Sequence, residues 1–184
     1  MATKNRRIHA LALGLSLTAT LILGADAPPK TVDVGGLTFE IPATWKEGKP
    51  TSSMRKAQIS IPASKGDNDP GELVVFVFPG GAGSVESNVS RWQGQFKSED
   101  GELPKVESKK VKGKNTDVTR VKIAGRYLDP FSKAGVKPGY QLLGAIVQTD
   151  DAGYFIKTIG PAKTIDDAEK AFDALIKSMN VTKK

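Results

Sequence analysis

The stretch YQLLGAIVQTDDAGYFIKTIG, residues 140–160, contains two apolar runs separated by a short polar turn. Branched and aromatic residues are frequent in both runs, which favours β-strands. The turn at residues 150–152 is short enough to join neighbouring antiparallel strands. We therefore expect a hairpin, with Gly144 and Ala145 in its first strand leaving room for a helix to approach the sheet closely.

The segment after this hairpin has the pattern of an amphipathic helix. Thr164 is a good N-cap residue, and Asp167 follows three positions later, as in a capping box. Apolar residues then recur at intervals of three and four positions, which places them on one helix face. They are Ile165, Ala168, Phe172, Leu175, Ile176 and Met179.

The segments before the hairpin predict further strands joined by turns. Residues 31–34 and 37–41 flank a Gly-Gly turn, residues 56–62 alternate between polar and apolar, and residues 72–78 form an apolar run. Residues 105–128 fit two strands about a KGKN turn. Each of these strands is expected to pair with a neighbour in the sequence.

A second helix is predicted after residue 83. Ser84 is a good N-cap residue, and the apolar residues that follow it recur at helical spacing. These residues are Val85, Val89, Trp92 and Phe96. Trp92 and Phe96 are interpreted as core residues, and Trp45, just past a strand end, is expected to pack as well.

The order of the predicted elements is ββββα-ββββ-α. Strands joined by short turns imply a mainly antiparallel sheet, and amphipathic helices must bury their apolar faces against it. The expected fold class is α+β, with an antiparallel sheet of about 6–8 strands sandwiched between helices.

Residues 1–27 have the features of a signal peptide. Lys4, Arg6 and Arg7 precede an apolar stretch, which ends before Ala25-Asp26-Ala27. We expect removal of this leader, export to the periplasm or the medium, and a single domain over residues 28–184 with no integral membrane span. An uncleaved anchor is the alternative, and Pro28 leaves the position of the cut open because proline hinders signal peptidases.

The composition of residues 28–184 excludes several kinds of catalytic site. The chain has no cysteine, and its only histidine, His9, lies in the leader. A Ser-His-Asp triad, a cysteine nucleophile and the usual zinc sites therefore cannot be built, and we predict no metal or cofactor. Loss of the leader lowers the formal net charge from +7 to +5, which favours anionic partners without selecting a class.

The stretch GLTFEIPATW, residues 36–45, resembles the opening strand of the PsbP-like superfamily. The resemblance implies an antiparallel sheet between helices, in agreement with the predicted order of elements. It also implies a role in binding or assembly, since most known roles in the superfamily are of that kind. Longer segments are similar to small secreted bacterial proteins. No functional motif of the superfamily can be carried onto residues of this chain.

A loop predicted at residues 129–139 is the first candidate site. Loops of this length often carry function. Tyr127, Phe131 and Tyr140 lie in or beside it together with Lys133 and Lys137. We interpret these five residues as the rim of a binding cleft, with a purely structural loop as the alternative.

A basic hairpin is the second candidate site. Positive charge is concentrated at Lys105, Lys109, Lys110, Lys112, Lys114, Arg120 and Lys122. The four central lysines, 109, 110, 112 and 114, are the candidate anion-binding surface. A solvated face that discourages edge-to-edge strand pairing is the alternative. No aromatic residue lies between residues 105 and 122, which argues against single-stranded nucleic acid.

Two weaker patterns are interpreted as turns. The segment FPGGAGSVE places Gly80, Gly81 and Gly83 before a helix, where backbone N–H groups can bind an anion, but a crossover turn explains it equally. Asp67 and its neighbours suggest a calcium loop, yet Phe78 stands where that loop requires an acid.

These observations favour an exported, non-catalytic binding or assembly module. Its partner would be an unidentified protein or an anionic component of the envelope. The alternative is a carboxylate-based hydrolase that acts on an envelope or extracellular polymer. Such an enzyme would draw its acids from Glu40, Glu47, Glu72, Glu86 and Asp129.

Overall fold

The computed structural model describes residues 27–129 and 135–182. The N-terminal part contains β1 (Lys30–Asp33), β2 (Leu37–Ile41), β3 (Lys46–Gly48), β4 (Arg55–Ile61), β5 (Gly71–Pro79) and α1 (Val85–Gln93). The C-terminal part contains β6 (Phe96–Lys97), β7 (Val106–Lys112), β8 (Asp117–Leu128), β9 (Val136–Gln148), β10 (Ala152–Pro161), α2 (Ala162–Ser178) and β11 (Asn180–Val181).

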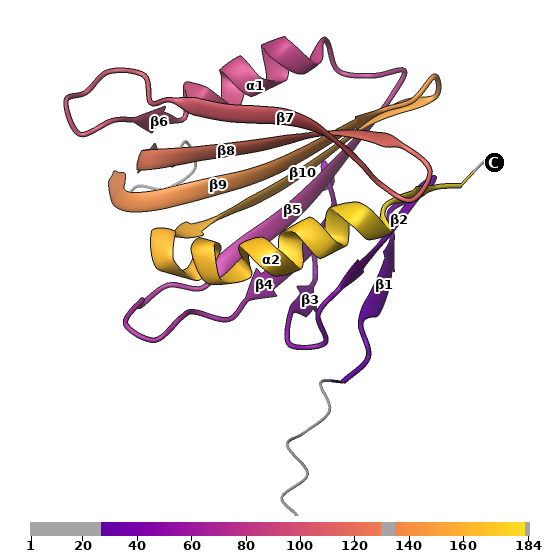
Figure 1. Cartoon of the computed structure of the whole chain (residues 1–184), viewed down its shortest axis with the longest axis horizontal. Coiled ribbons are helices and arrows are strands. Elements are labelled where there is room, and N and C mark those ends of the chain that lie inside the picture. Colours follow the sequence, from indigo (N-terminus) through magenta and orange to yellow (C-terminus); the bar gives the residue numbers. More distant parts are fainter. Residues whose placement is uncertain (1–26, 130–134, 183–184) are drawn as a thin grey trace, which may run out of the picture.

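An eight-stranded antiparallel sheet forms the centre of the fold (Figure 1). Its strand order is β3-β4-β5-β10-β9-β8-β6, and β7 also pairs with β8. A three-stranded sheet, β1-β2-β11, lies beside it. The α+β class, the antiparallel sheet and the two helices are confirmed. The short strands β3, β6 and β11 were not predicted.

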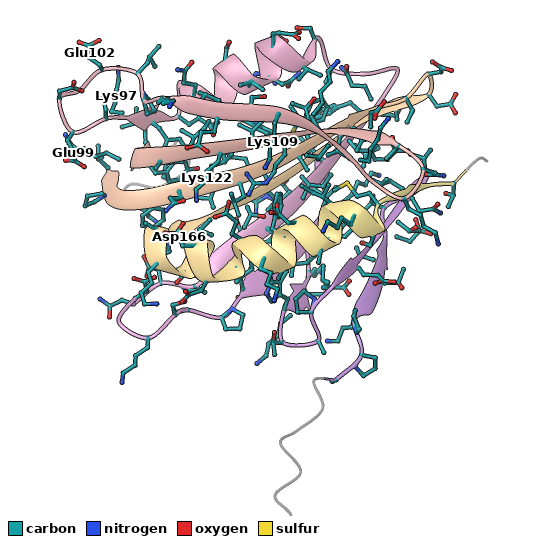
Figure 2. The ribbon with its side chains drawn as sticks, viewed as in Figure 1. Lys97, Glu99, Glu102, Lys109, Lys122 and Asp166 are labelled. Carbon is teal, nitrogen blue, oxygen red and sulfur yellow. The ribbon has the colours of Figure 1, made fainter. Side chains whose placement is uncertain are left out.

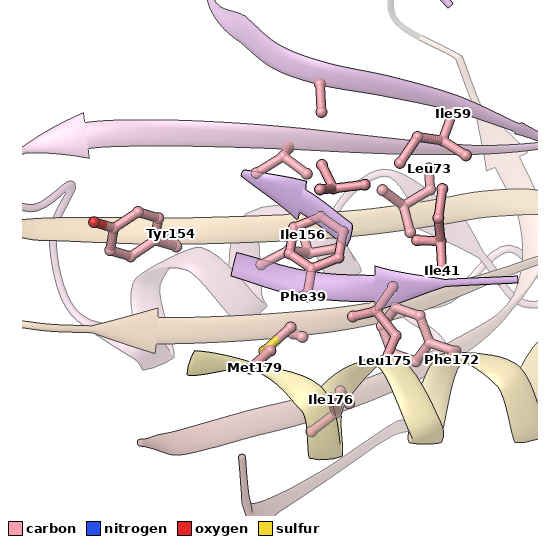
Figure 3. Packing of buried hydrophobic residues seen from close by; sticks show 14 of the residues in the cluster. Phe39, Ile41, Ile59, Leu73, Tyr154, Ile156, Phe172, Leu175, Ile176 and Met179 are labelled. Carbon is pink, nitrogen blue, oxygen red and sulfur yellow. The ribbon is translucent and has the colours of Figure 1, made fainter. Parts of the chain in front are cut away.

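The larger core lies between α2, the small sheet and one face of the large sheet (Figure 3). Phe39 and Ile41 of β2, together with Ile156 of β10, are buried here against Phe172 of α2. Every residue of the predicted apolar face of α2 is buried, and so is Trp45. The helical spacing of apolar residues predicted this part of the core correctly because one face of α2 is buried along its whole length.

The second core lies on the opposite face of the large sheet, under α1. Trp92 and Phe96 are buried in it, as predicted, although α1 ends at Gln93 and Phe96 belongs to β6. A β-carbon on Gly144 would lie 2.2 Å from Cζ3 of Trp92. The predicted close approach of a helix at Gly144 is therefore confirmed, with the Trp92 indole as the contacting group.

The start of α2 differs from its prediction. The helix begins at Ala162 after Pro161, so Thr164 lies inside the first turn and is not the N-cap. Asp67 takes the capping role, because its Oδ2 accepts hydrogen bonds from the backbone nitrogen and the hydroxyl of Thr164 at 2.8 and 2.6 Å. The turn formed by Asp67 and its neighbours thus supplies the acceptor that a cap provides.

The predicted loop at residues 129–139 is shorter than expected. The ladder of β8 and β9 extends to the pairs Tyr127–Lys137 and Leu128–Val136, past a register shift between Gly125 and Tyr127. The bulge lets β8 and β9 continue to pair, although the alternation of side chains between the two faces of the sheet is interrupted there. No helix in the described parts of the chain is long and apolar enough to cross a membrane.

Candidate functional site

A pocket of about 610 Å³ opens on the face of the large sheet that carries α1. We call it the α1-face pocket. Its floor consists of residues on β5 and β10, one wall comes from α1, and the other walls come from β4, the ends of β8 and β9, and the loop before β5. Its lining comprises Met54, Arg55, Asp69, Pro70, Glu72, Val74, Phe76, Phe78, Asn88, Arg91, Trp92, Gln95, Tyr127, Asp129, Lys137, Tyr140, Phe155, Lys157 and Ile159.

Strand alternation explains which residues reach this pocket. Leu73 and Val75 of β5 point into the larger core, so Val74 and Phe76 point to the opposite face. On β10 the same alternation sends Ile156 into the larger core and Lys157 into the pocket. Helix α1 covers only part of this face, and the uncovered part forms the floor.

Lys157 is the most unusual residue of the pocket. It lies in the middle of β10 and is only 9% exposed. Its Nζ donates a hydrogen bond to Oε1 of Gln95 and lies 5.7 Å from the centroid of the Tyr127 ring. Burial lowers the pKa of Lys157 from 10.5 to about 8, while the charge of Asp129 acts in the opposite direction. This amine thus loses its proton much more readily than a surface lysine.

An aromatic wall borders the pocket beside Lys157. The Tyr127 and Tyr140 rings are stacked with centroids 6.2 Å apart, and Phe96 contacts the Tyr127 ring from the core at 5.2 Å. Lys137 Nζ lies 5.3 Å from the centroid of the Tyr140 ring. Burial raises the pKa of Tyr127 to about 12, so its hydroxyl stays protonated at neutral pH.

The acidic residues of the pocket are bonded to neighbours. Oε1 of Glu72 accepts hydrogen bonds from Arg55 at 3.2 Å and from Gln58 at 2.7 Å. Oδ2 of Asp69 accepts one from the Tyr140 hydroxyl at 2.7 Å. Oδ2 of Asp129 lies 4.0 Å from Nζ of Lys137. These contacts fix the positions of the three carboxylates in the pocket lining.

Three of the five residues predicted at the loop lie together in the pocket lining. They are Tyr127, Lys137 and Tyr140. Phe131 and Lys133 lie outside the described residues, so their place relative to the pocket stays a prediction. Lys157 and Arg55 were not predicted as site residues from the sequence. The available signal for Lys157 was its position as the only charged residue in the apolar run GYFIKTIG.

The lysines of the basic hairpin do not share one surface. Lys109 pairs with Arg120 across β7 and β8, on the side of the sheet that faces α2. Lys110 is the next residue of β7 and points to the opposite face. Hydrogen bonds from the Glu86 backbone and from Ser84 lower the pKa of Glu86 on α1, and the charge of Lys110 adds to this shift. Lys112 forms a 2.5 Å ion pair with Asp117. Lys109 and Lys110, two of the four predicted lysines, thus lie on opposite faces of the sheet.

Arg120 and Lys122 form ion pairs with acids of α2. Lys122 and Asp166, which form one of these pairs, are labelled in Figure 2. Nε of Arg120 contacts Asp173 at 2.7 Å, and its Nη2 contacts Glu169 at 2.5 Å. Lys122 contacts Asp166 at 3.1 Å and Glu169 at 2.8 Å. These cations attach the helix to the sheet and do not add to an exposed basic surface.

The glycine-rich segment before α1 behaves as a turn. Gly80, Gly81 and Gly83 all have positive φ, and the N–H groups of Gly80 and Gly81 donate to the carbonyls of Asp151 and Phe78. Those N–H groups are therefore not directed at an anion. Ser84 caps α1 as predicted, since its hydroxyl accepts from the Ser87 N–H at 3.1 Å.

Other features of the described residues have fewer groups that could bind a ligand or catalyse a reaction. A second hollow of about 530 Å³ lies between α2 and residues 40–44, and Glu40 is the only charged residue in its lining. Among residues 27–129 and 135–182, no group of three or more acids is arranged to hold a metal ion. Of the acids proposed for a hydrolase, Glu72 and Asp129 line the α1-face pocket, and Glu47 and Glu86 line neither hollow.

Comparison with solved structures shows a PsbP-like fold. The cyanobacterial PsbP protein of Synechocystis sp. PCC 6803 superposes with a TM-score of 0.53 at 12% identity, over 90% of this chain and 99% of that one. LpqN of Mycobacterium tuberculosis, which is involved in cell envelope biogenesis, gives a TM-score of 0.53 at 11% identity, over 85% and 91% of the two chains. No protein-family model matches the sequence, and a search of curated proteins finds no match.

Proposed function

We propose that this chain is an exported, non-catalytic binding protein that holds a small organic molecule in the α1-face pocket. The observation that carries the proposal is the burial of Lys157 at the pocket floor. A buried amine with a neutral amide as hydrogen-bond partner destabilises a fold, so its presence beside an open pocket favours a role in binding. The volume of about 610 Å³ is in the range of small-molecule sites.

The lining supports binding more than hydrolysis. Apolar and aromatic side chains cover the floor around Lys157, and nine charged or amide side chains in the lining supply polar groups that can orient a ligand. Glu72 is bonded to Arg55 and Gln58, which holds its carboxylate as an acceptor. A glycosidase acid needs the opposite environment, one that keeps the carboxyl group protonated.

The test is native mass spectrometry of the full chain purified from its own host. We expect an additional mass that is released on denaturation. Val74→Trp fills the pocket floor and should abolish that mass, whereas Lys109→Met, on the exposed β7 strand, should retain it. Lys157→Met provides a second pocket variant if Val74→Trp does not fold. Retention of the same mass in both pocket variants would overturn the proposal.

The proposed export rests on the leader at residues 1–27, which precedes the first described strand. The likeness to LpqN, a protein involved in cell envelope biogenesis, supports the same location. N-terminal sequencing of the protein from its host should give a chain that begins close to Pro28. Recovery of a chain that still begins at Met1, in the cell interior, would contradict export.

A further inference from the structure

Some cations of the α1-face pocket form ion pairs with acids, and others do not. Its acids contact Arg55, Lys137 and the Tyr140 hydroxyl. Lys157 and Arg91 also line the pocket, and their hydrogen bonds go to amide oxygens. No ion pair joins either cation to an acid of the described residues. The pocket therefore holds two cations whose charges are not matched by a bonded carboxylate.

Each of these cations has an amide oxygen as its hydrogen-bond partner. Gln95, two residues past the end of α1, accepts a hydrogen bond from Lys157, and Arg91 lies in the last turn of α1. Arg91 Nη1 donates to Oδ1 of Asn88 at 3.1 Å, which draws the guanidinium along the pocket wall. Lys157 and Arg91 thus donate to the amide oxygens of Gln95 and Asn88, and each cation can exchange that oxygen for a better acceptor. An anion with two oxygens is such an acceptor.

The rest of the floor is apolar and largely aromatic. Val74, Phe76 and Phe155 come from neighbouring strands, and the edge of Trp92 closes one side. Aromatic side chains bind flat rings through stacked or edge-to-face contacts. Charge interactions are also stronger beside a buried group such as Lys157 than at the surface. The ligand therefore needs an apolar body as well as an anionic group.

The formal charge of the pocket lining favours a ligand with one negative charge. The lining contains four cations, Arg55, Arg91, Lys137 and Lys157, and three acids, so a monoanion neutralises it. A cationic ligand would lie against Lys157 and Arg91. We infer that the α1-face pocket binds an aromatic monocarboxylate, with the carboxylate held by Lys157 and Arg91. This inference rests on the proposed function.

The test compares ligands that differ only in the head group. The probes are 3-phenylpropionate, 3-phenylpropan-1-ol and 3-phenylpropan-1-amine, titrated into the full chain at neutral pH by calorimetry. The Trp92 indole N–H signal in NMR spectra reports occupancy of the pocket. We expect the carboxylate to bind at least about tenfold more tightly than the alcohol, and the amine to bind most weakly.

Lys157→Met keeps the length of the side chain and removes its charge. In this variant the preference for the carboxylate should fall below about threefold, while the affinity for the alcohol is unchanged or higher. Arg91→Met should give a smaller loss and serves as the second variant. Lys109→Met is the control and should preserve the preference.

The outcomes separate this inference from the proposed function. Equal binding of alcohol and carboxylate at Trp92 overturns the head-group assignment and leaves a binding pocket in place. Binding of the carboxylate that does not shift the Trp92 signal, or no binding of any probe at millimolar concentration, overturns the inference. The proposed function is tested independently, by the mass that copurifies with the chain.

Discussion

Lys157 and Tyr127 meet at the floor of the α1-face pocket, with the lysine Nζ 5.7 Å from the centroid of the tyrosine ring. They belong to strands β10 and β8, which β9 separates in the sheet. A ring face attracts a cation, and Gln95 adds one hydrogen bond, but neither replaces the hydration that a lysine loses on burial. The protein thus keeps a destabilising residue in the centre of its sheet.

Lys157→Met should therefore stabilise the protein at neutral pH. Below about pH 8 the lysine is charged in both the folded and unfolded chain, and the folded state bears the full desolvation penalty. That penalty corresponds to about 3 kcal/mol for a pKa lowered from 10.5 to about 8. We expect a gain of about 1–3 kcal/mol in the free energy of unfolding, measured by urea denaturation at pH 7.

The gain in the free energy of unfolding of Lys157→Met should decrease as the pH rises. Between about pH 8 and 10.5 the folded wild type loses the proton before the unfolded chain does, so its stability increases relative to the variant. The charged neighbours Asp129, Glu72 and Arg55 are present in both proteins, so they affect the difference only through their interactions with the Lys157 amine, which are part of its pKa shift. A difference between wild type and Lys157→Met that stays constant from pH 7 to 10 would contradict the burial of a charged amine.

Gly144→Ala should destabilise the second core. The added methyl group would lie 2.2 Å from Cζ3 of Trp92, so the indole or the strand must move. We expect a loss of about 1–3 kcal/mol in the free energy of unfolding, with a change in tryptophan fluorescence. Gly48→Ala is the control, because its nearest heavy atom is 3.8 Å away. Trp92→Leu should cost less in the Gly144→Ala background than in the wild type.

Arg120→Met should weaken the attachment of α2 to the sheet. The Arg120 side chain is 6% exposed and contacts Glu169 and Asp173, whose own side chains are 32% and 43% exposed. Because water can reach the two acids that remain, we expect a loss of about 2–3 kcal/mol, below the usual cost of breaking a fully buried pair. Lys122→Met, at the more exposed pair beside it, should cost less than about 1 kcal/mol. Equal effects in thermal denaturation would refute this ranking.

Asp67→Ala separates two hypotheses for the start of α2. The sequence pattern assigns the cap to Thr164 with Asp167, whereas the structure gives Asp67 both hydrogen bonds to Thr164. We expect Asp67→Ala to lower the free energy of unfolding by about 1 kcal/mol. Asp167 pairs with Lys163 at an exposed surface, so Asp167→Ala should have a smaller effect. A larger effect at Asp167 would favour the capping box.

Local patterns were sufficient to predict both helices, most of the core and all strands except the short β3, β6 and β11. The apolar face of α2 is set by residues within one helix, and the hairpin turn at residues 150–152 by its own polarity. The cap of α2 was mispredicted because the acceptor, Asp67, is 97 residues away from Thr164. No local rule relates two such positions.

The pocket could not be assembled from the sequence for the same reason. Tyr127, Lys137 and Tyr140 were recognised because the ends of β8 and β9 are close in sequence. Arg55 of β4 joins Lys157 of β10 only because β5 and β10 are neighbours in the sheet, and that order follows from tertiary packing. Distant residues also changed the predicted basic hairpin. Arg120 is paired with acids of α2 that lie about 50 residues further along the chain.

The affinity for an aromatic monocarboxylate should depend on pH through Lys157. Below about pH 8 the lysine is protonated before the ligand arrives, and the affinity should be constant. Above that pH the amine must take up a proton to pair with the carboxylate, so the dissociation constant should rise about tenfold per pH unit until the pKa of the complex is reached. Tyr127, with a pKa of about 12, stays neutral in this range.

Calorimetry with 3-phenylpropionate at pH 7, 8, 9 and 10 measures this dependence directly. Titrations in buffers of different ionisation enthalpy should show uptake of close to one proton per ligand at pH 9 and much less at pH 7. Lys157→Met removes the titrating amine, so its weaker binding should be independent of pH over the same range. Because the alcohol probe needs no cation, its affinity should also stay constant. A pH-independent affinity for the carboxylate in the wild type would mean that Lys157 does not contact the bound ligand.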